Sequence, residues 1–166
     1  TGGMQLEVLC LDRATGRVLW INEAGFARGP THGKIGYASA TPATDGQRVY
    51  VSFGNAGLFC FDFAGRRVWH EGLHSDQHEW GAATSPVLFG GQVIQVCDQG
   101  EESFIAAFDT ASGALRWRTP RTSGGGWSSP VVAQSPGGMR HELIVNGSGA
   151  GAGQGGGWVV AYDPGL

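Results

Sequence analysis

The chain has few charged residues, and it lacks several features that mark common classes of protein. Only 15% of its 166 residues are charged, against about 25% in typical domains. Lys and Arg number 11 against 14 Asp and Glu, so the basic surplus of a nucleic-acid-binding protein is missing. No apolar run approaches the roughly 20 residues that a membrane helix needs. We therefore expect neither a nucleic-acid partner nor a membrane span.

Cysteine is also scarce. The chain has an odd number of cysteines, namely Cys10, Cys60 and Cys97, and none of them lies in a Cys-x-x-Cys pair. A disulfide framework or a structural zinc site is therefore not expected. The first residues show neither the basic segment nor the apolar segment of a signal peptide.

Glycine is abundant instead, with 30 residues, and much of it belongs to an internal repeat. Each copy begins with a short apolar run that ends in Asp, and a turn with Gly or Pro follows. In the first three copies a second apolar run then ends in Trp. Such a repeat of about 50 residues is typical of structures built from one stacked unit. The repeated positions are Asp12, Trp20, Asp62, Trp69, Asp109, Trp117 and Asp163.

A second motif lies between these copies. An aromatic residue precedes a run of small residues and a Pro, and a β-rich run follows. Together the two motifs predict four short strands per repeat, and no segment has the periodicity and length of a helix. Series of four-stranded units of this length indicate the blades of a β-propeller. The predicted units are the last two strands of a blade at 1–21, complete blades at 38–70 and 82–118, and an incomplete blade at 127–163.

The repeated residues have structural roles in this interpretation. A Trp at one place per blade is suited to packing between neighbouring blades. The Asp begins the turn into the last strand, where its carboxylate can accept hydrogen bonds from backbone N–H groups. The predicted fold class is thus all-β, with four-stranded antiparallel blades.

The stretches Leu11–Trp20 and Phe108–Trp117, alternating with Ser85–Val87, resemble the pyrroloquinoline-quinone-type (PQQ-type) β-propeller repeat. Proteins with this repeat include bacterial quinoprotein dehydrogenases, a lipoprotein scaffold of outer-membrane barrel assembly, and exported propellers. Their seven or eight blades imply that this chain is a partial arc of about three to four blades. The resemblance also implies that the remaining blades belong to a longer chain, exported to the periplasm or surface of a bacterium.

Loops carry function more often than blade strands do. In a propeller, the loops between blades and those joining the second and third strands share one rim. We predict ligand contacts there, from polar and aromatic side chains. The candidates are Tyr37, Asn55, His74, Asp76, His78, Trp80, Asp98, Gln99 and Trp127.

Two groups among these candidates permit a metal-site hypothesis. His74, Asp76 and His78 have donor atoms for a divalent cation, with Glu79 as a fourth ligand. The acidic turn Asp98–Glu102, together with Asn55, offers oxygen atoms for a ligand or for Ca²⁺. A solvated loop and an ordinary polar turn are the preferred interpretations, so no metal site is predicted. The Gly-x-Gly-x-x-Gly match at 151–156 precedes a strand rather than a helix, and it predicts no phosphate site.

Two functions are consistent with these patterns. The favoured one is a non-catalytic binding or scaffold platform, without a cofactor, that engages a protein, peptide or glycan through its rim loops. The alternative, which the resemblance implies, is part of a PQQ- and calcium-dependent dehydrogenase that oxidises alcohols or sugars. In that family an adjacent pair of cysteines flanks the quinone, and this sequence has no such pair. The enzyme hypothesis is therefore the less favoured.

Overall fold

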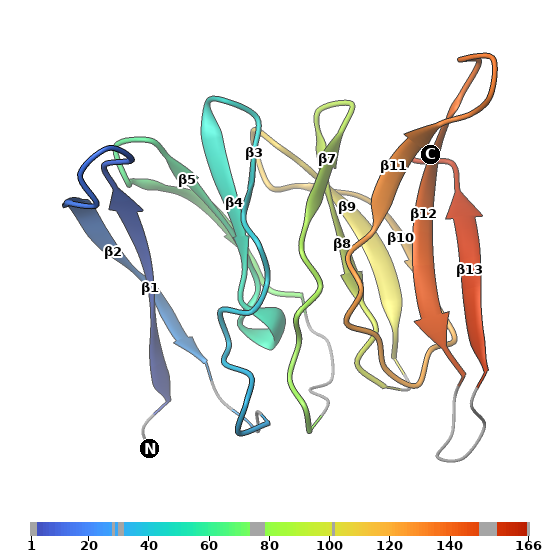
Figure 1. Cartoon of the computed structure of the whole chain (residues 1–166), viewed down its shortest axis with the longest axis horizontal. Coiled ribbons are helices and arrows are strands. Elements are labelled where there is room, and N and C mark those ends of the chain that lie inside the picture. The colour runs from blue at the N-terminus through green and yellow to red at the C-terminus, as the bar shows by residue number, and fades with distance from the viewer. Residues whose placement is uncertain are drawn as a thin grey trace.

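The computed structural model describes residues 3–27, 29, 32–73, 79–100, 102–149 and 156–165. Within these residues, thirteen strands form four antiparallel sheets that stand side by side (Figure 1), and in each sheet the strands pair in chain order. The first sheet has two strands, the next two have four each, and the last has three. This arrangement confirms the all-β fold and the four-stranded antiparallel blades. The strands are β1 (Met4–Leu11), β2 (Val18–Ala27), β3 (Ala43–Thr44), β4 (Arg48–Ser52), β5 (Leu58–Asp62), β6 (Arg67–Glu71), β7 (Val87–Phe89), β8 (Gln92–Cys97), β9 (Phe104–Asp109), β10 (Leu115–Pro120), β11 (Val131–Gln134), β12 (His141–Ser148) and β13 (Gly157–Tyr162).

The first sheet extends further than the sequence predicts. Strand β2 continues to Ala27, past the predicted end at residue 21, because its last residues remain paired with β1 as far as Met4. The pairing skips Ala24, where the register shifts. A bulge of this kind lets a strand bend without losing its partner. In the part of the chain that the structure describes, the only helical turn is η1 (Gly54–Ala56), between β4 and β5.

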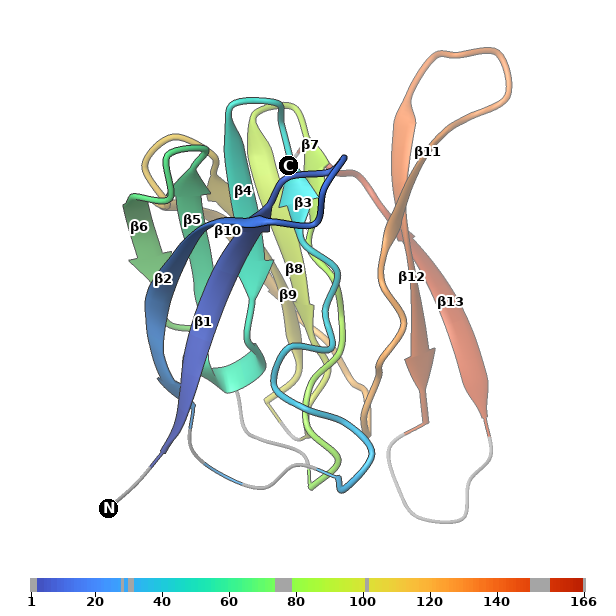
Figure 2. The same cartoon turned by 60° about the vertical axis from the view of Figure 1, so that its left-hand side comes forward.

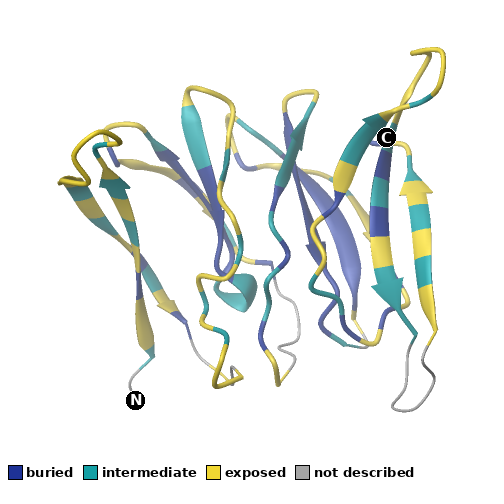
Figure 3. Cartoon of the chain, in the orientation of Figure 1, coloured by how far each residue is buried: buried dark blue, intermediate teal, exposed yellow. Residues whose placement is uncertain are grey.

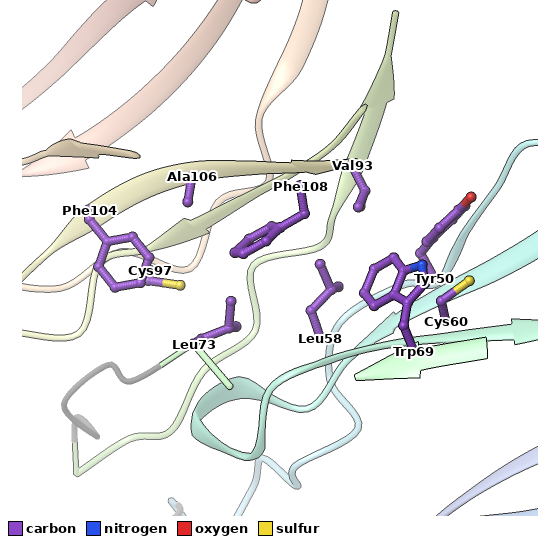
Figure 4. Close-up of a cluster of buried hydrophobic side chains, with 10 residues drawn as sticks. All are labelled: Tyr50, Leu58, Cys60, Trp69, Leu73, Val93, Cys97, Phe104, Ala106 and Phe108. Atoms are coloured by element: carbon purple, nitrogen blue, oxygen red, sulfur yellow. The ribbon is translucent and has the colours of Figure 1, made fainter. Parts of the chain in front are cut away.

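Figure 2 shows the sheets from a second side. Apolar side chains fill the spaces between neighbouring sheets. Figure 4 shows the cluster between the second and third sheets, where Leu58 and Trp69 face Val93 and Phe108. Both middle sheets are covered on two faces, so β5, β8 and β9 are buried almost along their whole length (Figure 3). This explains why their sequences do not alternate between apolar and polar residues. Each large side chain buried in this way contributes about 1.5–3 kcal/mol.

The repeated Trp connects each of the first two sheets to the next sheet by a hydrogen bond and a ring contact. The Nε1–H of Trp69 donates a hydrogen bond of 3.0 Å to the backbone oxygen of Thr110, in the turn after β9. Its ring lies against Gly113, so closely that a Cβ at this glycine would be 2.8 Å from the ring. The predicted packing between blades is therefore present, and it also explains the repeated turn glycine. The first boundary has the same contacts, made by Trp20, Phe63 and Gly65.

The repeated Asp closes the turn that follows it. The carboxylate of Asp109 accepts hydrogen bonds from the N–H groups of Ala111 and Ser112, at 3.0 and 2.8 Å. The hydrogen bond from Arg116, and then those from Ser112, hold the pKa of Asp109 well below its usual value. These contacts confirm the capping role predicted from the sequence. Equivalent hydrogen bonds from backbone N–H groups reach Asp12, Asp62 and Asp163.

The residues before the repeated prolines form a hydrogen-bonded ladder that the sequence analysis did not anticipate. The N–H of Thr41 donates to the hydroxyl of Ser85 at 2.8 Å, and the N–H of Ser85 donates to the hydroxyl of Ser129 at 3.0 Å. We call Thr41, Ser85 and Ser129 the serine ladder. Because each member precedes the first strand of its sheet, the ladder joins the chain segments that enter successive sheets.

Removing one hydroxyl from the serine ladder should weaken the structure measurably. In a Ser85→Ala variant the N–H of Thr41 loses its acceptor, so we expect a loss of about 1 kcal/mol in the free energy of unfolding. Urea denaturation followed by Trp fluorescence measures this loss. The matched control is Ser128→Ala, an exposed serine next to the ladder. Equal stability of the two variants would show that the ladder contributes nothing.

Candidate functional site

The loops divide between two opposite ends of the sheets. The turns that join the first strand of a repeat to the second, and the third to the fourth, lie at one end, at the top of Figure 1. The loops between sheets and those joining second and third strands lie at the other end, which we call the loop rim. This grouping places loops that are distant in the sequence next to one another. The loop rim is therefore where a site built from several blades can form.

Three loops each contribute an aromatic ring to one cluster on the loop rim. The ring centroids of Trp80 and Trp127 are 5.6 Å apart, with 31° between their planes. His32 approaches Trp80 edge-on, at 6.1 Å between centroids. We call His32, Trp80 and Trp127 the aromatic cluster. The structure thus brings together two residues that were predicted as ligand contacts, and it adds His32, which has no distinguishing pattern around it in the sequence.

The aromatic cluster is open to solvent and held in position. Trp80 is 49% exposed, although it is one of the largest apolar side chains in the chain. Trp127 is half-buried, and its Nε1–H donates a hydrogen bond of 2.9 Å to the backbone oxygen of Gly81. This bond ties the loop that carries Trp127 to the loop that carries Trp80. The cluster can therefore present a preformed aromatic surface to a ligand.

A buried ion pair supports the loop rim close to this surface. Both carboxylate oxygens of Asp98 accept hydrogen bonds from the guanidinium of Arg121, each at 2.8 Å, and both side chains are almost fully buried. Arg121 also donates to the hydroxyl of Tyr162 at 2.6 Å and lies over the ring of Trp158. Burial lowers the pKa of Arg121, but the hydrogen bonds and charge of Asp98 outweigh it and raise the pKa overall.

Backbone hydrogen bonds join the loops on either side of the ion pair. The N–H of Gly126 donates to the backbone oxygen of Asp98 at 2.9 Å, and the N–H of Arg121 donates to that of Ser103 at 2.8 Å. Trp127 directly follows this braced segment. Asp98 was predicted as a ligand contact, but both of its carboxylate oxygens bind Arg121, so its role here is to stabilise the loop rim. Sequence reasoning missed Arg121 as its partner.

Of the other predicted contacts, three lie among the described residues and three lie outside them. Tyr37 is half-buried at the boundary of the first two sheets, where its hydroxyl donates to the backbone oxygen of Gly29. Asn55 lies in η1 and Gln99 is buried beside Asp98. In the described part of the chain, no group of three or more His, Cys, Asp or Glu is arranged to hold a metal ion. The candidates His74, Asp76 and His78 lie outside the described residues.

The repeat and the stacked sheets agree with a comparison against known protein families. The family model described as "Outer membrane protein assembly factor BamB" matches residues 5–165. The chain belongs to this family. It is thus a PQQ-type β-propeller sequence, as its repeat motif indicated. No curated protein matches the chain at a significant level.

Solved structures of similar fold include BamB and two dehydrogenases. BamB from Moraxella catarrhalis is 16% identical, with a TM-score of 0.52; the match covers 95% of this chain and 43% of BamB. A quinohemoprotein alcohol dehydrogenase from Pseudomonas putida is 19% identical, with a TM-score of 0.59, and 90% and 27% are covered. A europium-containing methanol dehydrogenase is 16% identical, with a TM-score of 0.52, and 71% and 22% are covered.

These likenesses establish the propeller fold of the chain and no more than the fold. The chain spans less than half of the length of each of these three structures. Within the described residues, no helix is long and apolar enough to cross a membrane.

Proposed function

We propose that the chain is part of a non-catalytic PQQ-type propeller that binds a segment of another protein through the aromatic cluster on its loop rim. The observation that carries this proposal is the position of Trp80. It is half exposed, yet it is held between His32 and Trp127, which come from two other loops. Exposed Trp side chains fixed in advance are typical centres of protein interfaces, because they bury a large area at a small entropic cost.

The family supports a scaffold role for the same surface. Its description names an assembly factor for outer membrane proteins. By analogy, the partner of the loop rim is a protein segment, and the parent chain is exported to a bacterial periplasm. An extended segment suits a surface of this kind, since one apolar side chain can stack on Trp80 while its backbone follows the neighbouring loops.

The dehydrogenase alternative finds less support in the described residues. A quinone with Ca²⁺ needs oxygen ligands that converge on one place. The buried carboxylate of the loop rim, Asp98, directs both of its oxygens to Arg121. The donor set around it therefore does not fit a quinone and its cation, and the described residues favour binding over oxidation chemistry.

Replacing Trp80 should weaken binding by the loop rim. Peptides selected from a random display library against the immobilised chain supply the probe, and their affinity is measured by biolayer interferometry. We expect Trp80→Ala to weaken the binding of rim-specific peptides about tenfold or more, because a central Trp contributes about 2 kcal/mol or more to an interface.

Phe63→Ala is the matched control for this experiment. Phe63 is 53% exposed, but it lies in the β5–β6 turn at the opposite end of the sheets. We expect its replacement to leave the affinities unchanged. If Trp80→Ala leaves every selected peptide bound as tightly as before, the aromatic cluster is not the binding surface.

A further inference from the structure

A glutamine stands at a buried position where two other sheets have valine. Val51 of β4, Gln95 of β8 and Val145 of β12 each pair with the residue three positions before the repeated Asp of their sheet. They therefore hold equivalent places in the repeat, and all three are buried, with Gln95 only 2% exposed. Burying an amide costs stability unless its donors and acceptors find partners. Packing alone therefore does not explain Gln95.

The amide of Gln95 is satisfied only in part. Gln95 lies on the same face of β8 as Val93 and Cys97, because side chains alternate along a strand, and these two belong to the cluster in Figure 4. Its Nε2 donates two hydrogen bonds of 3.0 Å, to the backbone oxygens of Thr84 and Val96. Its Oε1 has no hydrogen-bond partner in the part of the chain that the structure describes. The donation by Nε2 is thus what the glutamine adds over a valine.

The hydrogen bond to Thr84 anchors the segment that follows Trp80. Residues 81–86 belong to no strand or helix, so individual contacts determine their path. Thr84 is 3% exposed, four residues after the half-exposed Trp80. The amide that holds its oxygen belongs to β8, which is paired with β7 on one side and β9 on the other. Gln95 thus ties this loop segment to the middle of a four-stranded sheet.

The other end of the same segment contacts the aromatic cluster. The backbone oxygen of Gly81 accepts the hydrogen bond from Nε1–H of Trp127, at 2.9 Å. Between the two ends, Ala82 packs against Gly54 of η1, so closely that a Cβ at this glycine would be 2.8 Å from the Cβ of Ala82. A segment held at these three points is short and rigid. A shift at Thr84 would therefore be transmitted to both tryptophans of the cluster.

We propose that Gln95 is a positioning residue for the aromatic cluster. Its donation to Thr84 fixes the orientation in which Trp80 meets a ligand, while Gln95 itself touches no ligand. A polar group that breaks the packing pattern of the repeat is typical of functional sites, where stability is exchanged for a defined geometry. This inference rests on the proposed binding by the loop rim.

A Gln95→Met variant tests the proposal, because methionine keeps the length of the side chain and lacks its donor. The oxygen of Thr84 loses a hydrogen bond, but the unpartnered Oε1 is removed as well, and the two effects offset each other. We therefore expect the melting temperature to stay within about 2 °C of the parent. The affinity for peptides that depend on Trp80, measured by biolayer interferometry, should fall about fivefold, because the cluster is no longer preorganised.

Ile94→Val is the matched control. Ile94 is the neighbour of Gln95 in β8, but it packs at the opposite boundary, in one cluster with Leu143. We expect its replacement to lower the melting temperature by about 2–4 °C and to leave the peptide affinity unchanged. The two variants thus separate binding from stability. Gln95→Val, which introduces the residue of the other two sheets, should behave like Gln95→Met.

Hydrogen–deuterium exchange of the chain without peptide gives a readout that does not depend on the proposed function. Amides of residues 80–85 should exchange faster in Gln95→Met than in the parent, because their segment has lost an anchor. Exchange in β5 of the neighbouring sheet should be unchanged.

Two results would overturn the proposal. The first is parent-like exchange of residues 80–85 in both Gln95 variants, whatever the peptides do. The second is an unchanged affinity of both variants for peptides that Trp80→Ala no longer binds. If no selected peptide depends on Trp80 but residues 80–85 exchange faster, the proposed function fails and the anchoring of this segment by Gln95 is supported.

Discussion

An Asp98→Ala variant is expected to lose about 3–5 kcal/mol of its free energy of unfolding, because it leaves the charge of Arg121 buried without its partner. The guanidinium would keep its hydrogen bond to Tyr162 and its place over Trp158, but both carboxylate contacts would disappear. Urea denaturation monitored by circular dichroism measures the loss.

A double variant separates the unpaired charge from the altered shape of the site. Asp98→Leu combined with Arg121→Met removes both charges, and a buried pair replaced by apolar residues is often close to neutral in stability. Most of the lost stability should therefore return. Glu142→Ala is the surface control, since it breaks the exposed ion pair with Arg140 and should cost at most about 1 kcal/mol. A loss from Asp98→Ala no larger than the loss from this control would contradict the role of the ion pair.

A Gly113→Ala variant should lose about 2–4 kcal/mol, for two reasons that add together. The backbone at Gly113 has φ of +78°, a conformation that a residue with a Cβ adopts only with strain. The new Cβ would also lie 2.8 Å from the ring of Trp69, in the preceding sheet. Thermal and urea denaturation of the purified chain measure the loss.

Gly16 provides the comparison, because it holds the same place in the repeat without a tryptophan above it. Its φ is +71°, and nothing lies within 4 Å of the position of a Cβ. Gly16→Ala should therefore show the backbone strain alone, about 1–2 kcal/mol. If the two variants lose the same stability, the contact with Trp69 has no energetic effect.

Most of the fold could be predicted from the sequence because its signals are local and repeated. The Asp carboxylates bind N–H groups two to four residues ahead, and the turn glycine is close to them in the chain. The serine ladder could not be found in this way. Its hydrogen bonds join residues 44 positions apart, and its members looked like ordinary residues before a proline. The bulge that lengthens β2 also has no clear sequence signal.

The candidate site was predictable only in part, for a similar reason. Trp80 and Trp127 belong to the repeat, so the sequence places them on the same rim, and the structure brings them together. His32 joins them from a glycine-containing loop whose path no local pattern determines. Asp98 was recognised as polar and close to the rim, but its partner Arg121 is 23 residues away. Burial of both side chains becomes visible only once the sheets are stacked.

The sheets are stacked as propeller blades, and each of the first two is joined through its Trp to a turn of the next sheet. The most direct test is to measure the loss caused by Gly113→Ala in a Trp69→Leu background, by urea denaturation. Without the indole ring only the strain of the backbone should remain, so the loss should fall to that of Gly16→Ala. A loss that is the same with and without the Trp69 ring would contradict the stacking described for this chain.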